Sequence, residues 1–538
     1  MYKLTTVSSL DKVFATGAPK IVEHGGTMLK NERYNFQVAI YSDYERTSPR
    51  NTVTVEGIDA SAVTVREVVE IPAGLASYPD SDDYVIKPGI GTGLYPDLLR
   101  PIENGNVMIR PESYTTLWIT IHSPEGLTPG NYDVKVTVKN EWENKEFSAD
   151  YALEVLPAEL PENDLIYTNW FHYDSIVDYY RVEPFGDEFY KIFGSFLDSA
   201  VTHGMNMLYV PLFTPPLDTE VGGERTTVQL VDIARKGDKY SFGFDKLGKF
   251  VRFAAKHNVK YYEMSHLTTQ WGAKVCPKIM ATTENGYERI FGWDVPSLSD
   301  EYKSFLTQFL PALDVFLKKE GIAERTYFHI SDEPNAEQRP YYNEIYDFVR
   351  SLIEGYKVMD ASSDLESKVD CPVISTTHAT SDMPEKNWAY YCCSSYNNYL
   401  SNRFFNMPGE RNRVLGLQLY ISGVKGFLQW GFNFYLSQYS IRKINPFVDT
   451  DAGGAFPSGD AFVVYPGDDG TAWDSLRLEV FCEALEDLAA LKSLEKKIGR
   501  EAAVALVKGE GVDGWTEYPH DPVWLKSFRE KINRMLTD

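Results

Sequence analysis

Apolar and polar residues alternate with a period of two through the first 160 residues of the chain. The alternation is clearest in the segments YNFQVAIYS, TVTVEGI, AVTVREVVEI, TTLWITIHS and NYDVKVTVKN, and turn-forming clusters such as PEGLTPGNY separate them. Short strands with turn signals and almost no helical period are typical of an antiparallel sandwich. We therefore predict a β-sandwich domain over residues 1–160, followed by EVLPAELPEN, a linker stiffened by two prolines.

The pattern changes after residue 164. Short apolar segments then alternate with longer amphipathic stretches, which indicates βα units and a parallel sheet. Eight strands with helices between them fit a TIM-like (β/α)8 barrel, and a short connection between the fifth and sixth strands would distort it. We predict the strands at 165–171, 206–212, 259–265, 325–331, 356–361, 372–377, 387–393 and 426–431.

The predicted fold is thus multidomain, with an antiparallel β-sandwich followed by an α/β barrel. An extra strand at 461–467 and a closing helix at 475–497 follow the eighth barrel strand. We place the barrel domain at 165–495 and a C-terminal helical tail at 496–538.

Charge and composition argue against nucleic-acid and membrane partners. The formal net charge is −24, and an acidic surface repels nucleic-acid phosphates and anionic membranes. The chain has no run of about 18 apolar residues, so we expect no membrane partner. Five cysteines without metal-ligand spacing, and a start without an apolar leader, indicate a cytoplasmic protein. The 14% aromatic content is compatible with a sugar-binding cleft as well as with a large core.

The segment YFHISDEPN, 327–335, ends a predicted strand in two adjacent carboxylates, Asp332 and Glu333. Chemistry in such barrels sits at the C-terminal ends of the strands. Alternation along the strand points Glu333 into the mouth of the barrel, and a bulge near Pro334 could bring Asp332 there as well. The structural alternative is that Asp332 caps the helix that follows.

Paired carboxylates serve two kinds of glycoside hydrolysis. Most glycosidases place them on opposite sides of the scissile bond, and here Glu263 or Asp360 would have to supply the second one. In substrate-assisted hydrolysis, the 2-acetamido oxygen of the sugar is the nucleophile. One carboxylate then stabilises the acetamido N–H while its neighbour protonates the leaving oxygen. An Asp-Glu dipeptide supplies two carboxylates on one side of the bond.

Five segments together resemble glycoside hydrolase family 123 and the wider group of proteins that share its catalytic domain. They are FHISDEP, EMSHLTTQWGA, GFLQWGFNFY, FPSGDAFVVYPG and SLRLEVFCEALEDLAAL. The resemblance covers about 165–495, and the sandwich in front matches the architecture of the family. It implies retaining, exo-acting hydrolysis of terminal β-linked N-acetylgalactosamine through an oxazoline. In this family Glu333 would be the general acid/base and Asp332 would stabilise the intermediate, with no metal ion or organic cofactor. The substrate would be an oligosaccharide or glycoconjugate.

Further residues near the predicted strand ends offer rings and polar groups to a sugar. Trp271 and Trp430 are candidates for stacking, and either Tyr391 or Tyr390 could bind the acetamido carbonyl. The two histidines of the rim lack a third ligand at a spacing typical of a metal site. The predicted substrate-binding residues are Trp170, His172, His266, Trp271, Tyr391, Trp430, Asn433 and Tyr435. The long segment 215–230 is expected to shape the site.

Two other functions stay open from the sequence. The first is a retaining glycosidase for a sugar without the 2-acetamido group, with Glu263 or Asp360 as nucleophile. The second is a carbohydrate-binding protein without catalytic activity. No sequence pattern points to an oligomeric state.

Overall fold

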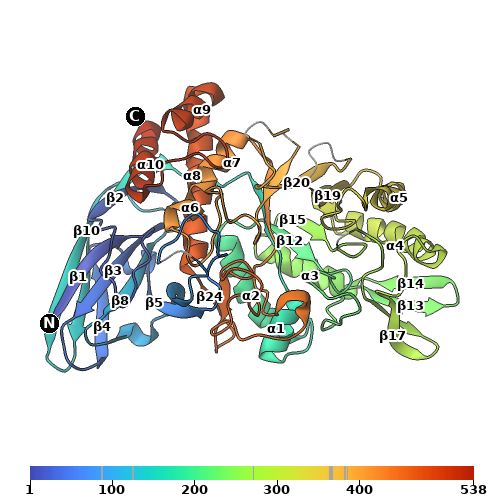
Figure 1. Ribbon diagram of the computed structural model, residues 1–538, viewed down its shortest axis with the longest axis horizontal. Helices are drawn as coiled ribbons and strands as arrows, with labels where there is room; N and C mark the ends of the chain where they lie inside the picture. Colours follow the sequence, from blue (N-terminus) through green and yellow to red (C-terminus); the bar gives the residue numbers. More distant parts are fainter. Residues whose placement is uncertain are drawn as a thin grey trace.

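The computed structural model describes residues 1–86, 89–123, 126–270, 272–362, 368–380, 383–384 and 386–537. Its two main bodies lie side by side, with the sandwich at one end and the barrel at the other (Figure 1). The C-terminal helices lie above the contact between them in this view. Within the described part of the chain, no helix combines the length and the apolar character needed to cross a bilayer.

Two five-stranded sheets form the N-terminal body. The first has the order β1 (Tyr2–Ser8), β3 (Tyr34–Ser42), β8 (Tyr114–Ile121), β5 (Val63–Ala73) and β6 (Gly93–Pro101). The second has the order β2 (Gly25–Lys30), β10 (Lys145–Glu159), β9 (Gly130–Asn140), β4 (Ser48–Glu56) and β7 (Asn106–Ile109). Alternate apolar residues such as Val38 and Val136 form the core between them. The sheets are antiparallel as predicted, except that β2 pairs with β10 in parallel.

Eight parallel strands close into a barrel, and each overlaps a strand predicted from the sequence. In order around the barrel they are β11 (Ile166–Asn169), β12 (Met207–Val210), β15 (Tyr261–Met264), β18 (Thr326–Phe328), β19 (Lys357–Ser362), β20 (Cys371–Ser375), β21 (Trp388–Tyr390) and β22 (Gly426–Gln429). Side chains such as Met207, Met359 and Trp388 fill the interior. The barrel is therefore a packed core whose open face is its rim.

The helical layer is less regular than in a symmetrical (β/α)8 barrel. Its helices are α1 (Tyr173–Tyr180), α2 (Asp187–Thr202), α3 (Asp245–Lys256), α4 (Asp300–Lys319), α5 (Arg339–Arg350), α6 (Gly409–Arg413), α7 (Leu415–Ser422) and α8 (Leu476–Ile498). The described residues form no helix between β19 and β20 or between β20 and β21. This agrees with the short connection that the sequence places between the fifth and sixth strands.

The segments that follow β12 and β15 add a four-stranded sheet that the sequence did not predict. Its order is β14 (Lys239–Gly243), β13 (Asp232–Lys236), β16 (Ile279–Thr283) and β17 (Gly286–Phe291). This sheet projects from the side of the barrel that lies away from the sandwich (Figure 1).

The end of the chain ties the two bodies together. A two-stranded sheet, β23 (Val464–Pro466) and β24 (Ala472–Asp474), precedes α8 and overlaps the extra strand that was predicted. Helices α9 (Arg500–Gly509) and α10 (Pro522–Thr537) follow α8. Arg529 of α10 forms ion pairs with Glu32 of the sandwich and with Asp487 of α8. The predicted tail 496–538 thus packs against both bodies.

Candidate active site

Asp332 and Glu333 stand on irregular backbone beyond the end of β18. The strand ends at Phe328, and the next helix, α5, begins at Arg339 with Gln338 as its N-cap. The helix-cap alternative for Asp332 is therefore wrong, because that residue lies well before the start of α5. Glu333 has a φ of +45°, and such left-handed backbone at a non-glycine residue is typical of functional sites.

The Asp332 carboxylate has little to balance its charge. It is half-buried, and within the described part of the chain it accepts no hydrogen bond and forms no ion pair. Burial and the adjacent Glu333 carboxylate raise the pKa of Asp332 well above its usual range, although His329 acts in the opposite direction. The two neighbouring carboxyl groups therefore resist ionising together.

Glu333 is exposed and has a partner from across the mouth of the barrel. The Tyr390 hydroxyl, at the end of β21, donates a hydrogen bond to its Oε1 atom. Tyr390 was the alternative to Tyr391 in the sequence analysis. Tyr391 does not reach this place, because its side chain is fully buried and its ring packs against Phe427.

Beneath the dipeptide, His329 joins the two other candidate carboxylates. It forms hydrogen-bonded ion pairs with Glu263 through Nε2 and with Asp360 through Nδ1, the latter at 3.0 Å. Burial lowers the pKa of His329, but the two carboxylates outweigh burial and raise it to about 9. The imidazolium is thus the counter-ion of this layer.

Glu263 and Asp360 have further partners that hold them inside the barrel. Glu263 accepts hydrogen bonds from Thr168 Oγ1 and from Trp170 Nε1, each at 2.7 Å. Asp360 accepts from the Tyr342 hydroxyl at 2.5 Å and from the Ile330 amide at 2.9 Å. The last bond fixes the backbone that leads to Asp332.

His266 belongs to the same layer. Its ring stacks on that of His329 with a centroid distance of 4.3 Å, and its Nδ1 lies 2.8 Å from the Tyr209 hydroxyl. Burial and the positive His329 hold its pKa well below the usual range. Its Nε2 has no hydrogen-bond partner among the residues that the structure describes. Of the predicted sugar-binding residues, Trp170 and His266 therefore contact this buried layer, Trp170 through Glu263 and His266 through His329.

Three other predicted sugar-binding residues are held in backbone contacts. The His172 amide donates to Asn433 Oδ1 at 2.9 Å, and Asn433 Nδ2 donates back to the His172 carbonyl at 3.2 Å. The Tyr435 hydroxyl donates to the Val464 carbonyl at 2.9 Å. All three side chains are buried, so these groups join loops rather than face a ligand. Trp271 lies outside the described residues.

Trp430 lies at the mouth of the barrel and is hydrogen-bonded to Asp460, a carboxylate that was not predicted from the sequence. Its Nε1 donates to Asp460 Oδ2 at 3.0 Å, and its ring is half-buried. Burial raises the pKa of Asp460 to about 7, against the effect of Arg403. Asp460 belongs to the segment FPSGDAFVVYPG, but it follows no barrel strand and so did not stand out.

The segment 215–230 is anchored close to this rim. Arg225 forms a buried ion pair with Asp174 at 2.7 Å and contacts His172 Nδ1 at 3.1 Å. Burial raises the pKa of Asp218, in the same segment, to about 6. Its backbone amide donates to Gln270 Oε1 at 2.6 Å. The expectation that this segment borders the site agrees with these contacts.

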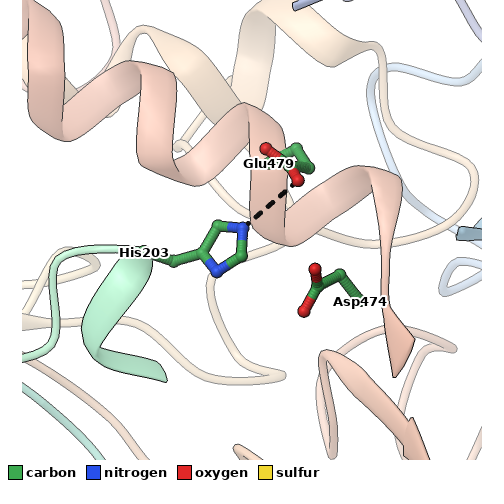
Figure 2. Close-up of side chains that lie close together, drawn as sticks. All are labelled: His203, Asp474 and Glu479. Carbon is green, nitrogen blue, oxygen red and sulfur yellow. Dashed lines mark ion pairs between the residues drawn. The ribbon is translucent and has the colours of Figure 1, made fainter. Parts of the chain in front are cut away.

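One His/Asp/Glu group in the described part of the chain has atoms close enough for a metal ion, and it lies away from the barrel mouth. His203, Asp474 and Glu479 place one ligand atom each within 4.8 Å of one another (Figure 2). Glu479 also forms ion pairs with Arg33 and Arg66, and Arg66 pairs with Asp474 at 2.8 Å. Two guanidinium groups already neutralise these carboxylates, so the group is an ion-pair network between sandwich and barrel.

A cavity of about 860 Å³ opens at the opposite end of the barrel. Asn206 and Lys260, which line it, immediately precede β12 and β15. It therefore lies at the N-terminal ends of the strands, far from the carboxylate pair, whereas barrel chemistry sits at the C-terminal ends.

The arrangement at the mouth corresponds to a known family. The family description "Glycoside hydrolase 123, catalytic domain" matches residues 170–494. This chain belongs to glycoside hydrolase family 123. The matched region holds the barrel strands from β12 to β22 together with Asp332–Glu333, and it begins directly after β11. The family 123 enzyme is thus a glycosidase, and its substrate is a glycan.

Similar solved structures extend the comparison to the whole chain. A family 123 glycoside hydrolase from Clostridium perfringens is 16% identical, with a TM-score of 0.76, over 100% of this chain and 97% of that one. Its fold therefore includes the sandwich. An endo-β-1,4-mannanase from Thermotoga petrophila is 13% identical, with a TM-score of 0.33, over 61% of this chain and 77% of that one. No match was found among curated proteins.

Proposed function

We propose that this family 123 member is a retaining exo-glycosidase that releases terminal β-linked N-acetylgalactosamine by substrate-assisted catalysis. One observation carries the proposal. Asp332 and Glu333 stand side by side at the mouth of the barrel, and neither forms an ion pair with a described residue. A pair of adjacent carboxylates suits a reaction in which the substrate brings its own nucleophile.

In the first step, the acetamido carbonyl oxygen attacks the anomeric carbon and the glycosidic bond breaks. Glu333 protonates the departing oxygen, and the Asp332 carboxylate accepts the acetamido N–H as positive charge develops on nitrogen. An oxazoline forms. In the second step, Glu333 takes a proton from a water molecule that attacks the same carbon, which restores the acetamido group and retains the configuration.

The charge of the free site supports these roles. The raised pKa of Asp332 favours a free site in which the dipeptide holds one proton. The proposed reaction needs one proton and one negative charge on this pair. Binding of the acetamido N–H to Asp332 favours its ionised form, and the proposed mechanism assigns the proton to Glu333 when the substrate is bound.

The alternative with a covalent nucleophile has weaker support. Glu263 is 0% exposed and Asp360 is 1% exposed, and each is hydrogen-bonded to His329. Either carboxylate would have to break several buried hydrogen bonds to approach a sugar. The alternative of a binding protein without activity is disfavoured by the intact acidic pair and its Tyr390 contact.

The substrate class is inferred from a relative as well as from the site. The Clostridium perfringens enzyme is described for glycolipid glycan hydrolysis. We propose that glycans of this kind, carrying terminal N-acetylgalactosamine, are substrates here, with no cofactor or metal ion. The cytoplasmic location stays a prediction.

Three aryl glycosides, assayed side by side, test the proposal. We expect p-nitrophenol release from the β-N-acetylgalactosaminide, slower release from the β-N-acetylglucosaminide, and very little from the β-galactoside, which has no acetamido group. EDTA should leave the rate unchanged. Equal rates on the galactoside and its N-acetyl counterpart would contradict the mechanism, and loss of activity on chelation would contradict the absence of a metal.

A further inference from the structure

The connection between β5 and β6 leaves the sandwich and crosses to the barrel. We call residues 74–86 the β5–β6 loop. At its start, the Leu75 amide donates to Asp451 Oδ2 at 2.8 Å, and the Leu75 carbonyl accepts from the Ser458 amide at 2.7 Å. Further along, Asp82 forms an ion pair with the buried Arg411 at 2.8 Å and accepts from the Tyr399 amide at 2.7 Å. The loop is thus fixed to the barrel at two places.

Tyr78 places an aromatic ring of the sandwich body at the barrel rim. Its ring meets that of Tyr396 edge-on, with a centroid distance of 4.8 Å, and its hydroxyl donates to the Ala455 carbonyl at 3.3 Å. Burial, followed by the interaction of its hydroxyl with Cys393, raises the pKa of Tyr78. Tyr78 therefore lies between the segment that follows β21 and the segment that follows β22.

Both of these segments belong to the candidate active site. Cys393 comes three residues after Tyr390, which contacts Glu333. The backbone amide of Cys393 is a hydrogen-bond partner of Asp460, which also binds the indole of Trp430. The β5–β6 loop is thus joined to the rim that carries Trp430.

The position of this rim around the barrel indicates what the loop does. In the closed order of eight strands, β22 lies four places from β18 and so faces it across the barrel. Glu333, beyond β18, protonates the leaving oxygen in the proposed reaction, so the leaving group lies on the β18 side. The β22 rim then faces the opposite, non-reducing end of the sugar that is released.

We propose that the β5–β6 loop, through Tyr78, closes the non-reducing side of the site and restricts the enzyme to terminal sugars. This inference rests on the proposed function. It assigns exo specificity to the sandwich body, which lies outside the matched catalytic region 170–494. A sugar attached to the far side of the bound residue would collide with the loop.

Two matched substrates test this assignment. One is p-nitrophenyl β-N-acetylgalactosaminide, and the other carries an additional sugar at O3 or O4 of the same residue. We expect the wild type to cleave the capped substrate at less than about 1% of the uncapped rate. Tyr78→Ala should raise the capped-to-uncapped ratio of kcat/KM by roughly 10-fold or more, since steric exclusion of a group in a pocket discriminates on this scale.

Tyr78→Phe keeps the ring and is the matched control, so its ratio should stay at the wild-type value. Tyr78→Leu, which keeps an apolar side chain against Tyr396, replaces the alanine variant if that protein does not fold. A wild type that cleaves capped and uncapped substrates equally would overturn the inference. Unchanged ratios in folded Tyr78→Ala or Tyr78→Leu would also overturn it. A wild type inactive on the uncapped substrate would instead refute the proposed function.

Discussion

Two groups of carboxylates in this molecule differ in how their charge is balanced. Glu479 and Asp474, at the contact between sandwich and barrel, are paired with Arg33 and Arg66. The Asp332–Glu333 pair at the barrel mouth has no ion-pair partner among the described residues. Burial raises the pKa of Glu479, but Arg33, Arg66 and His203 together outweigh burial and hold that pKa well below its usual range. Burial and Glu333 instead raise the pKa of Asp332.

This contrast distinguishes carboxylates that hold parts of the fold together from carboxylates that are suited to proton transfer. A buried carboxylate with a guanidinium partner stays ionised and holds two parts of the fold together. A pair without a cation has a raised pKa, and strongly shifted carboxyl groups in a barrel mouth are candidates for proton transfer. The Glu263–His329–Asp360 layer is intermediate, because its imidazolium forms ion pairs with both carboxylates and its charges act on Asp332.

The largest effect should come from Glu333→Gln. General acid catalysis contributes roughly 10²–10⁴-fold, so we expect turnover of a natural disaccharide to fall by about that factor. Activated aryl glycosides need less protonation and should lose less. Steady-state rates on both substrates measure this, and equal losses would show that Glu333 is not the proton donor. The folding stability should change little, because the residue is exposed.

Glu479→Gln tests the role of the carboxylates that are paired with arginines. Removing this charge leaves Arg33 and Arg66 without their main partner, and breaking a buried ion pair in this way costs about 3–5 kcal/mol. Denaturant unfolding should show this loss, while the kcat of the folded variant stays near the wild-type value. The matched control is Asp187→Asn, which breaks an exposed pair with Lys249 and should cost less than about 1 kcal/mol. Similar losses in the two variants would refute the contrast.

The intermediate layer predicts a pH dependence of stability. The pKa of His329 is raised to about 9 in the folded protein, above its ordinary value of about 6.5. The contribution of protonated His329 to the free energy of unfolding is therefore complete below about pH 6.5. It is lost as the pH rises through about 9, by up to roughly 3 kcal/mol. Unfolding free energies across this range measure the loss. The double variant Glu263→Gln/His329→Gln should show a smaller decline, and an identical decline would contradict the assignment.

Strand positions could be predicted because the barrel strands are short apolar runs between amphipathic helices. The additional sheet could not be predicted, because most residues of its strands are not buried. In β14, Lys239–Gly243, no residue is buried, so no apolar pattern marks it. The parallel β2–β10 pair likewise depends on a contact between distant segments.

Within the site, Asp332 and Glu333 stood out because two carboxylates end a buried strand. The choice between Tyr390 and Tyr391 could not be made, since one residue changes the face on which a side chain lies. The side chain of Asn433 bonds the backbone of His172, and residues so far apart in sequence give no local signal of that contact. Asp460 could be recognised as a residue of the site only from its hydrogen bond to Trp430 in the structure.

Binding of a thiazoline analogue of the oxazoline, measured by calorimetry, tests the central claim most directly. N-acetylgalactosamine serves as the ground-state ligand, and Asp332→Asn is the variant. We predict that the wild type binds the analogue far more tightly than the sugar. Asp332→Asn should weaken analogue binding and turnover by a comparable factor of about 10²–10³, with a much smaller effect on the sugar. Equal affinity of the wild type for analogue and sugar, or unchanged analogue binding by Asp332→Asn, would contradict substrate-assisted catalysis by this pair.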